Sequence, residues 1–398
     1  MTLSLCMIVK DEALRLHDCL SSVEALVDEM VVLDTGSTDG TVAIATQAGA
    51  RVYHYCWCDD FAAARNQALQ YVQTDWVLVL DADETLVEDI IPQIQGAIAQ
   101  PDYLAITLLR QEVGAAQSPY SMVSRLFRNH PQIQFVRPYH EWIDESVLAL
   151  QQQEQHWQIG YLPGIALKHT GYQADIIARQ HKHQRACKMM AAALVQQPQD
   201  AYLCSKLGAL YGSMGQVKAA LDLLQRGLEI QPLVSSVAYE LHFHLGNIYT
   251  QLGESAFAEQ HYQQALDQDL PSILKLGAYN NWANLLKAQG QLTAACRLYQ
   301  DLIDLQPDLA LAYYNLGLTL REQGDLEAAI AAYRQAIKHQ PNYADAYQNL
   351  GVALYKQGKS NLCRTALERA IALHLQQDNP QEADRLRQGL TDLGLAAD

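Results

Sequence analysis

The sequence predicts two folds in one chain: an α/β domain with a largely parallel sheet, followed by an all-α solenoid. In residues 1–170, short apolar runs alternate with stretches whose apolar residues recur at helical spacing. From about residue 198 a nine-residue phrase recurs instead. The length of 398 residues agrees with this division, because a chain of that size exceeds one compact core.

Four strands are expected near the start of the chain. They are LSLCMIV (3–9), EMVVLD (29–34), ARVYHY (50–55) and WVLVLD (76–81). Helical patterns at 12–26, 37–49 and 61–72 separate them. Strands that alternate with helices at this spacing pair in parallel through right-handed crossovers, and such sheets bind ligands beyond the carboxyl ends of their strands. The loops after these strands are therefore the first place to look for a site.

The second half of the chain is built from a repeated phrase. Its copies are LGALYGSMG (207–215), LGNIYTQLG (245–253), WANLLKAQG (282–290), LGLTLREQG (316–324) and LGVALYKQG (350–358). Prolines recur at nearly the same interval, and a small residue (Ala220, Ala258, Ala295, Ala329) follows each of the first four copies. The pattern resembles tetratricopeptide (TPR) repeats, which are stacked helix pairs. We expect domains at 1–172 and 198–398, joined by a helix at 173–197, with a capping helix after Pro380.

Composition and charge exclude several classes of protein. The net charge of −16 argues against a nucleic-acid partner, which would need a basic surface. The sequence offers no apolar run long enough for a membrane span, and its first residues read as a core strand and not as a signal peptide. A cytoplasmic protein is expected. The closely spaced cysteines of CWC (56–58) have one residue between them, which fits zinc-binding motifs poorly.

The stretch WVLVLDADE (76–84) ends a buried strand with two carboxylates, Asp81 and Asp83. Like charges this close cost stability unless a positive charge lies beside them. In an extended segment residues i and i+2 project to one side, so both aspartates can share a ligand. Hard cations such as Mg²⁺ and Mn²⁺ prefer carboxylate and phosphate oxygens. The interpretation is a DxD motif whose missing positive charge is a metal ion that arrives with a nucleoside diphosphate.

Four motifs in order, LCMIVKDEA, VVLDTGSTDGT, ARNQAL and WVLVLDADE, resemble the family 2 glycosyltransferases of the GT-A fold. The resemblance implies a nucleotide-sugar donor, and it assigns donor contacts residue by residue. The implied contacts are Ile8, Val9, Lys10 and Asp11 at the base pocket, Asp34 at the base or ribose, Arg65 and Asn66 near the nucleotide, and Asp81, Ala82 and Asp83 in the DxD motif. Asp39, in contrast, is expected to cap a helix within DTGSTDG.

The resemblance also implies the catalytic groups. Inverting transfer needs a carboxylate that takes the acceptor's proton, and Glu141 in VRPYHEWIDES is the candidate base, with Asp144 and Glu145 as rivals. His140 orients this base or contacts phosphate. His169, in IALKHTGY, completes the metal site with Asp81 and Asp83 or contacts the diphosphate. Lys168 and Arg137 either neutralise phosphate or are solvated.

The expected function is therefore that of an inverting, hexosyltransferase-type enzyme that uses a UDP-sugar with Mn²⁺ or Mg²⁺. The repeats favour a protein or peptide partner or acceptor, because arrays of this kind bind extended segments in a concave groove. Three alternatives stay open at this point. In the first, the acceptor is a saccharide or lipid. In the second, the repeats mediate assembly or a homo-oligomer, and in the third the chain is a non-catalytic scaffold.

Overall fold

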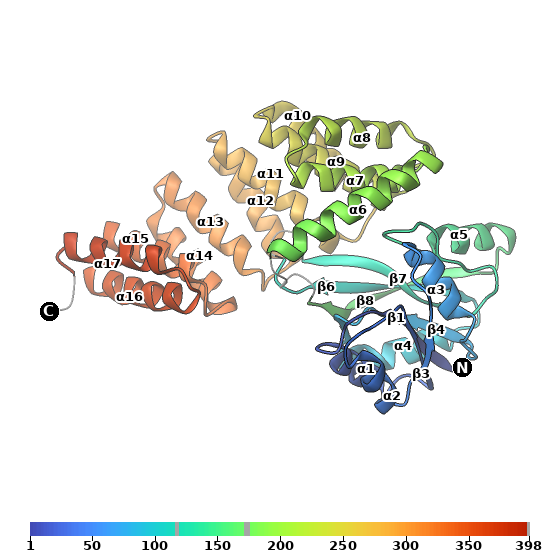
Figure 1. Ribbon diagram of the computed structural model, residues 1–398. Helices are drawn as coiled ribbons and strands as arrows, with labels where there is room; N and C mark the ends of the chain where they lie inside the picture. The colour runs from blue at the N-terminus through green and yellow to red at the C-terminus, as the bar shows by residue number, and fades with distance from the viewer. Residues whose placement is uncertain (116–118, 171–175, 396–398) are drawn as a thin grey trace. The chain divides into compact units, whose positions relative to one another are not determined.

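The structure, a computed structural model, describes residues 1–115, 119–170 and 176–395 and divides into two compact units (Figure 1). One unit is Met1–Ile230 and the other is Gln231–Asp398. The predicted domain boundaries stay predictions, and the one at residue 172 falls in 171–175, outside the described residues. The observed division lies further along the chain, after the first predicted repeat.

Over the described residues, the first unit contains a sheet of eight strands in the order β3-β2-β1-β4-β7-β6-β8-β5. They are β1 (Leu3–Val9), β2 (Glu29–Asp34), β3 (Arg51–His54), β4 (Trp76–Val79), β5 (Glu84–Leu86), β6 (Tyr103–Glu112), β7 (Tyr120–Arg128) and β8 (Gln158–His169). The four strands expected from the sequence are present, and β1 to β4 pair in parallel. β7 runs antiparallel to β4, so the complete sheet is mixed.

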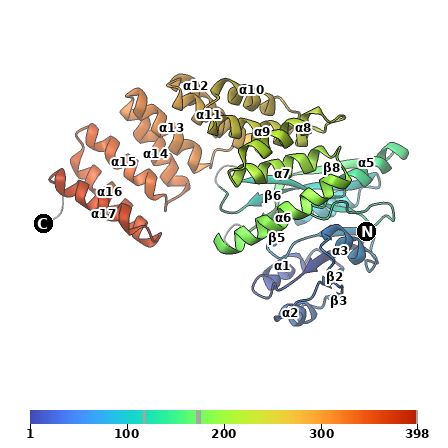
Figure 2. The same ribbon diagram turned by 45° about the horizontal axis from the view of Figure 1, so that its top comes forward.

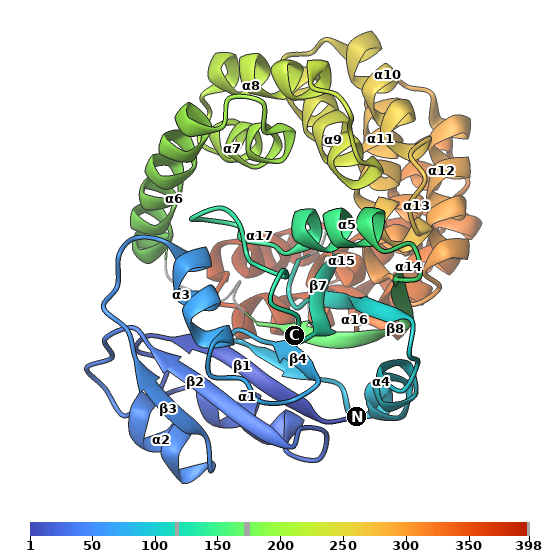
Figure 3. The same cartoon turned by 90° about the vertical axis from the view of Figure 1, so that its right-hand side faces the viewer.

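Helices cover both faces of this sheet. They are α1 (Leu16–Val23), α2 (Thr41–Gln47), a short 3-10 helix (Glu88–Ile90) and α4 (Ile91–Ile98) on one face, and α3 (Phe61–Leu69) and α5 (Asp144–Gln153) on the other. Figure 3 shows α3 and α5 above the sheet and α2 and α4 below it. Leu5 and Met7 of β1 enter one core and Cys6 enters the other, because successive strand residues face opposite sides.

Loops at the carboxyl ends of β1 and β2 are tied together beside the start of the DxD segment. The backbone N–H of Thr35 donates to Val9 O at 2.9 Å, and that of Thr38 donates to Asp11 Oδ1 at 2.7 Å. On the other side, β5 pairs antiparallel with β8 and sets Glu84 opposite His169. The sheet topology thus gathers the ends of β1, β2, β4 and β8 along one edge.

Three helices complete the first unit, α6 (Ile176–Gln196), α7 (Ala201–Ser213) and α8 (Val217–Glu229). They share a core that includes Met190, Leu194 and Leu203, and Tyr139 of the sheet domain packs against it. The first helix pair of the repeat region is therefore built onto the sheet domain.

The described part of the second unit is a series of helix pairs (Figure 2). They are α9 (Ser235–Gln251), α10 (Ser255–Leu266), a 3-10 helix (Ser272–Lys275), α11 (Leu276–Ala288), α12 (Leu292–Leu305), α13 (Ala310–Gln323), α14 (Leu326–His339), α15 (Ala344–Lys356) and α16 (Ser360–Gln376), with α17 (Pro380–Asp392) at the end. In each pair, one repeated phrase forms the end of the first helix and the turn that follows, as the sequence predicts. The predicted helix after Pro380 forms and packs on α16 through Ala383 and Leu386.

Two glycines show why the phrase has its form. Gly324 ends α13 with φ of +89°, a left-handed conformation that glycine adopts without a steric cost. Gly246 lies where α9 crosses α10, and a Cβ atom there would come within 2.6 Å of the Tyr262 ring. The first glycine turns the chain, and the second lets the two helices approach closely.

Within the described residues no helix is long and apolar enough to span a membrane. The cytoplasmic location stays a prediction from the sequence. The eight cysteines, all in the described part of the chain, are free thiols, and Cys56 and Cys58 of the CWC motif are exposed.

Candidate active site

Asp81 lies between two buried arginines. Its Oδ1 accepts a hydrogen bond from Arg65 Nη2 at 2.5 Å, and its Oδ2 accepts one from Arg125 Nη2 at 3.0 Å. The two arginine side chains are only 4% and 13% exposed. The sequence interpretation offered Asp81 no positive partner other than a metal ion. In the structure, side chains of α3 and β7 balance its charge.

These groups belong to a continuous chain of alternating charges, which we call the rim network. Its members are Asp83, His169, Glu112, Arg110, Glu84, Arg125, Asp81, Arg65 and Glu141, each within 4.0 Å of the next. Arg110 Nη1 donates to the fully buried Glu84 at 2.6 Å, and Arg65 Nε donates to Glu141 Oε1 at 2.6 Å. The network links the DxD motif at one end to the candidate base at the other.

Proton affinities follow from this pairing. Burial opposes ionisation of Asp81, but Arg125 and Arg65 hold the pKa of its carboxyl well below the usual range. Burial likewise opposes ionisation of Glu112, yet its hydrogen bond with His169 and the charge of Arg110 lower its pKa to about 2. The network carboxylates Asp81 and Glu112 are therefore ionised at neutral pH.

His169 stands between two carboxylates. Its Nδ1 is 2.5 Å from Glu112 Oε2, and its Nε2 is 3.2 Å from Asp83 Oδ2. Hydrogen bonds to Asp83 and Glu112 raise the pKa of His169 to about 9 despite burial, so in this arrangement the imidazolium form dominates at neutral pH.

The Asp83–His169 pair fits a divalent cation in one specific respect. A metal-binding histidine usually donates its other ring N–H to a carboxylate, which fixes its orientation, and Glu112 stands in that position at Nδ1. A cation at Nε2 would have to displace the proton now shared with Asp83. Within residues 1–115, 119–170 and 176–395, no group of three or more His, Cys, Asp or Glu side chains is arranged to hold a metal ion.

The two aspartates of DTGSTDG have different surroundings. Asp34 is 3% exposed, and its carboxylate accepts hydrogen bonds from the backbone N–H groups of Gly36 at 3.2 Å and Ser37 at 3.0 Å. His54 Nδ1 lies 3.3 Å from the same carboxylate. Asp39 accepts a hydrogen bond of 3.0 Å from the backbone N–H of Thr41, the first residue of α2, although the N-cap residue of that helix is Gly40. Asp34 therefore organises its own turn, and its predicted contact with the nucleotide stays a prediction.

The remaining predicted donor contacts lie around the same edge. Ile8 and Val9 end β1, Lys10 is exposed in the loop that follows, and Ala82 is buried. Asp11 has a left-handed backbone with φ of +55°. Asn66 is already engaged, because its side-chain amide donates to Phe135 O at 2.9 Å and accepts from Phe135 N at 2.8 Å. Asn66 thus anchors the segment that leads to Glu141.

Glu141 lies in a small closed loop between β7 and α5. The loop is closed by a hydrogen bond from Val136 N to Trp142 O of 3.0 Å. His140, beside Glu141, is exposed, has φ of +55°, and meets the Tyr139 ring edge-on at 4.8 Å between centroids. The structure thus brings Glu141 to Arg65 and holds His140 on the outer side of the same loop.

The rival bases and the extra cations have separate partners. Burial raises the pKa of the Asp144 carboxyl, although a hydrogen bond with Ser124 acts in the opposite direction. Glu145 is 54% exposed and pairs with Arg137. Arg137 is buried, so it is not the solvated cation that the sequence allowed, whereas Lys168 is exposed.

Sequence reasoning missed Glu112, Arg110 and Arg125. Arg110 and Glu112 are two apart on β6 and face the same side, and Arg125 interrupts the apolar pattern of β7. A charge inside an otherwise apolar strand was the available signal. Which acid each arginine meets depends on strand pairing, which one sequence does not reveal.

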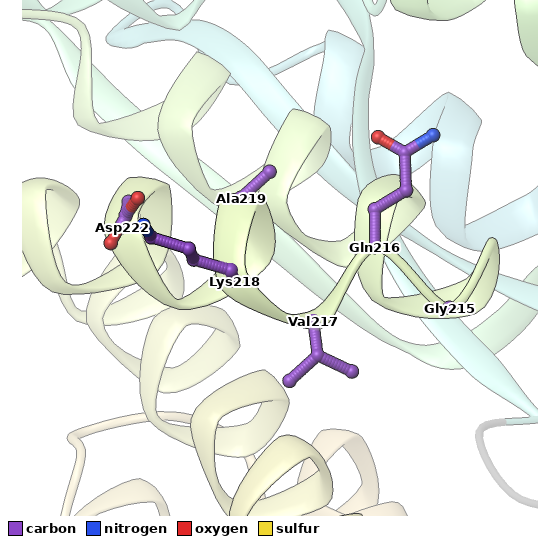
Figure 4. A pocket seen from close by; sticks show the side chains of 6 residues that line it. All are labelled: Gly215, Gln216, Val217, Lys218, Ala219 and Asp222. Atoms are coloured by element: carbon purple, nitrogen blue, oxygen red, sulfur yellow. The ribbon is translucent and has the colours of Figure 1, made fainter.

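A separate hollow of about 570 Å³ lies at the turn between α7 and α8 (Figure 4). It is lined by Gly215, Gln216, Val217, Lys218, Ala219 and Asp222. None of these residues is a predicted donor or catalytic group, and the hollow contributes nothing to the rim network.

Comparisons with known proteins agree with both halves of the chain. The profile of glycosyl transferase family 2 matches residues 4–160, and tetratricopeptide profiles match 241–273, 283–324, 317–358 and 344–374. A TPR repeat-containing protein of Synechococcus elongatus is 48% identical over 292 residues, which are 73% of this chain and 72% of that protein.

Two further matches cover parts of the chain. An uncharacterized glycosyltransferase of Rickettsia felis is 40% identical over 101 residues, which are 25% of this chain and 35% of the relative. Among solved structures, YrrB, a TPR protein with an unusual peptide-binding site, has a TM-score of 0.39 at 20% identity and covers 50% of this chain and 100% of its own.

The fold and the matches define a class of protein, a GT-A-like sheet domain followed by a tetratricopeptide solenoid. Residues 4–160 match glycosyl transferase family 2, and the chain belongs to the TPR repeat-containing proteins. Family membership supports glycosyl transfer, and the family generally uses nucleotide-sugar donors and often divalent cations. The resemblance and the fold class predicted from the sequence are confirmed.

Proposed function

We propose that this protein is an inverting glycosyltransferase of the hexosyltransferase type that moves a sugar from a UDP-sugar to an acceptor nucleophile on a protein or peptide. The observation that carries the proposal is the rim network, which gathers Asp83, His169 and Glu141 from distant segments at one sheet edge. Charged side chains gathered away from water are costly to desolvate even when they are paired, and a site for a charged substrate is a reason to keep them.

Asp83 and His169 are the proposed protein ligands of a divalent cation, Mn²⁺ or Mg²⁺. Two observations favour this assignment. His169 Nε2 lies 3.2 Å from Asp83 Oδ2, and Glu112 holds the opposite ring nitrogen of His169 by a hydrogen bond. Such a cation offsets negative charge on the leaving diphosphate, and diphosphate oxygens would complete its coordination. Asp81, held by Arg65 and Arg125, is proposed to face the ribose or a water molecule of that coordination shell.

Glu141 is the proposed general base. The acceptor O–H would give its proton to the carboxylate while the acceptor oxygen bonds to the anomeric carbon, and the electron pair of the broken bond would leave with UDP. Arg65 fixes one oxygen of Glu141 at 2.6 Å, which sets the direction of the other. Asp144 is the second candidate because burial raises its pKa, and a raised pKa favours a base that works near neutral pH.

The repeats are proposed to bind the acceptor. Amide side chains form hydrogen bonds between successive first helices, with Asn281 Nδ2 donating to Asn247 Oδ1 at 2.8 Å and Asn315 Nδ2 donating to Asn280 Oδ1 at 2.9 Å. Asn280 and Asn315 are buried, whereas the half-buried Asn247 and Asn281 suit contacts to an extended peptide backbone. A saccharide or lipid acceptor, with repeats used for assembly, is the second candidate, and the family's use of nucleotide sugars favours both over a scaffold.

Hydrolysis of the donor by water tests the proposal without a known acceptor. UDP-glucose, UDP-galactose, UDP-N-acetylglucosamine, GDP-mannose and dTDP-glucose would be incubated with the protein and Mn²⁺ and followed by proton NMR. We expect a UDP-sugar to be hydrolysed with inversion at the anomeric carbon and Glu141→Gln to abolish the reaction. Asp144→Asn would identify Asp144 as the base if it alone were inactive. Retention of configuration, or hydrolysis of no donor, would contradict the proposal.

A further inference from the structure

The loop 136–142, which presents Glu141, has a backbone that must be held in place. Arg137 and His140 have φ of +76° and +55°, in the left-handed region that non-glycine residues rarely adopt. Such residues persist only where the surrounding structure fixes them. On one side, α3 contributes a hydrogen bond from Phe61 N to Pro138 O of 3.0 Å.

On the other side, the loop is fixed by the start of α7. Arg137 Nε donates to Asp200 Oδ2 at 2.6 Å, and the two side chains are 5% and 6% exposed. The guanidinium carbon lies 4.9 Å from the Trp142 ring centroid and 5.0 Å from that of Tyr202, and these rings stack at 4.3 Å. We call these four residues, Arg137, Trp142, Asp200 and Tyr202, the loop clamp.

The clamp is an inefficient way to gain stability alone. A buried ion pair often contributes less than apolar packing of equal volume, because both charges lose their hydration. Here the Nη1 atom of Arg137 is also buried, with no acceptor among the described residues. What the pair does provide is direction, because a guanidinium bound through Nε to one carboxylate and through Nη2 to Glu145 has a fixed orientation.

We propose that α7, the first helix of the first tetratricopeptide repeat, positions the base: Asp200 holds Arg137, and Arg137 holds the loop that aims Glu141 at the acceptor. The inference rests on the proposed function, with Glu141 as base. Asp200 and Arg137 are positioning residues and touch no reacting atom. The helix pair of α7 and α8 is then a working part of the transfer site, which agrees with its place in the same unit as the sheet domain.

The substitution Asp200→Asn separates this role from helix capping. Asp200 Oδ1 caps α7 by accepting from Leu203 N at 2.9 Å, and asparagine caps as well as aspartate does. The variant therefore keeps the cap and loses the charge that holds Arg137. Asp325→Asn is the matched control, because Asp325 caps α14 through Ala328 N at 3.0 Å and has no arginine partner within the described residues.

Kinetics test the catalytic half of the inference. With the UDP-sugar that the wild type hydrolyses fastest in the NMR panel, Asp200→Asn should lower kcat by about 10- to 100-fold and leave KM unchanged, since a small displacement of a catalytic group costs turnover and not donor binding. Arg137→Met should lower kcat equally, and the double variant should add nothing. An unchanged kcat, or a KM that rises as kcat falls, would overturn the inference.

Hydrogen exchange tests the structural half independently of activity. In Asp200→Asn the amides of Val136 and Phe61 should lose protection while Leu203 keeps it, and in Asp325→Asn all three should stay protected. If the wild type hydrolyses no donor, the proposed function fails and the exchange result still decides whether α7 holds the loop. Full protection of Val136 in Asp200→Asn would overturn the clamp itself.

Discussion

The helical repeats and the rim network are stabilised in opposite ways. In the repeats, contacts join residues of the same or the neighbouring repeat, such as Gly246 and Tyr262 or Asn247 and Asn281. In the rim network, partners come from all over the first unit, as with Arg65 and Glu141 or Glu112 and His169. Apolar packing within each repeat and against its neighbour stabilises the repeats. The network is stable only when each charged side chain has a partner of opposite charge.

The largest expected change in the free energy of unfolding comes from removing one charge from the rim network. Arg65→Met removes the cation between Asp81 and Glu141: Asp81 keeps Arg125, but Glu141, whose side chain is 11% exposed, loses its hydrogen-bonded arginine. We expect a loss of about 3–5 kcal/mol in the free energy of unfolding, measured by urea denaturation, because breaking a buried pair strands a charge.

Arg185→Met is the matched control for this experiment. Arg185 pairs with Asp59 at 2.9 Å, but the two side chains are 52% and 74% exposed. An exposed pair contributes roughly 1 kcal/mol or less. Equal losses in the two variants would contradict the view that the rim network is buried and interdependent.

A smaller effect is expected from close packing in the repeats. Gly246→Ala places a Cβ atom against the Tyr262 ring, which is buried and cannot turn away, and should destabilise the protein by about 1–3 kcal/mol. Gly389→Ala in α17 meets no atom within 4 Å and should stabilise it by about 0.5–1 kcal/mol, because alanine suits a helix better. Urea denaturation of both variants checks the opposite signs; the same sign in both would refute the packing argument.

The smallest expected effect is a pH dependence of folding stability that arises in the repeats. Burial, with a lesser contribution from His261, lowers the pKa of His242 on α9 from 6.5 to about 4. In the unfolded chain His242 is protonated below about pH 6.5, whereas in the folded chain it is protonated only below about pH 4. The free energy of unfolding therefore falls as the pH drops through this window. His242→Gln cannot take up this proton, and its unfolding midpoint should vary less between pH 6.5 and 4 than that of the wild type. Identical slopes would show that His242 is not the group responsible.

How far the sequence predicts the structure follows the same division. The strands before Asp34 and Asp81 and the helix pairs around the repeated phrases were predictable, because apolar periodicity and glycine placement are local signals. Asp83, His169 and Glu141 were found one by one, through motif resemblance. Arg110 and Arg125, which pair with Glu84, Glu112 and Asp81, were not found, because the pairing of β6, β7 and β8 that brings them together is tertiary.

The loop clamp marks the same limit at a domain boundary. The repeat pattern begins near residue 198, so the sequence predicts a solenoid domain from that residue onward. The unit boundary instead follows Ile230, because Asp200 and Tyr202 of α7 are bound to Arg137 and Trp142. A periodic pattern identifies a type of element, but the burial of an ion pair decides what that element packs against.

The central claim, that the rim network is a donor site, is tested most directly by calorimetric titration of UDP into the wild type and Asp83→Asn, each with Mn²⁺ and with EDTA. We predict binding to the wild type that requires Mn²⁺ and that is lost in Asp83→Asn, at a temperature where urea denaturation shows both proteins to be folded. Binding of UDP that is equally strong in EDTA and in the variant would contradict the role of Asp83, and absence of binding in every condition would contradict the donor site itself.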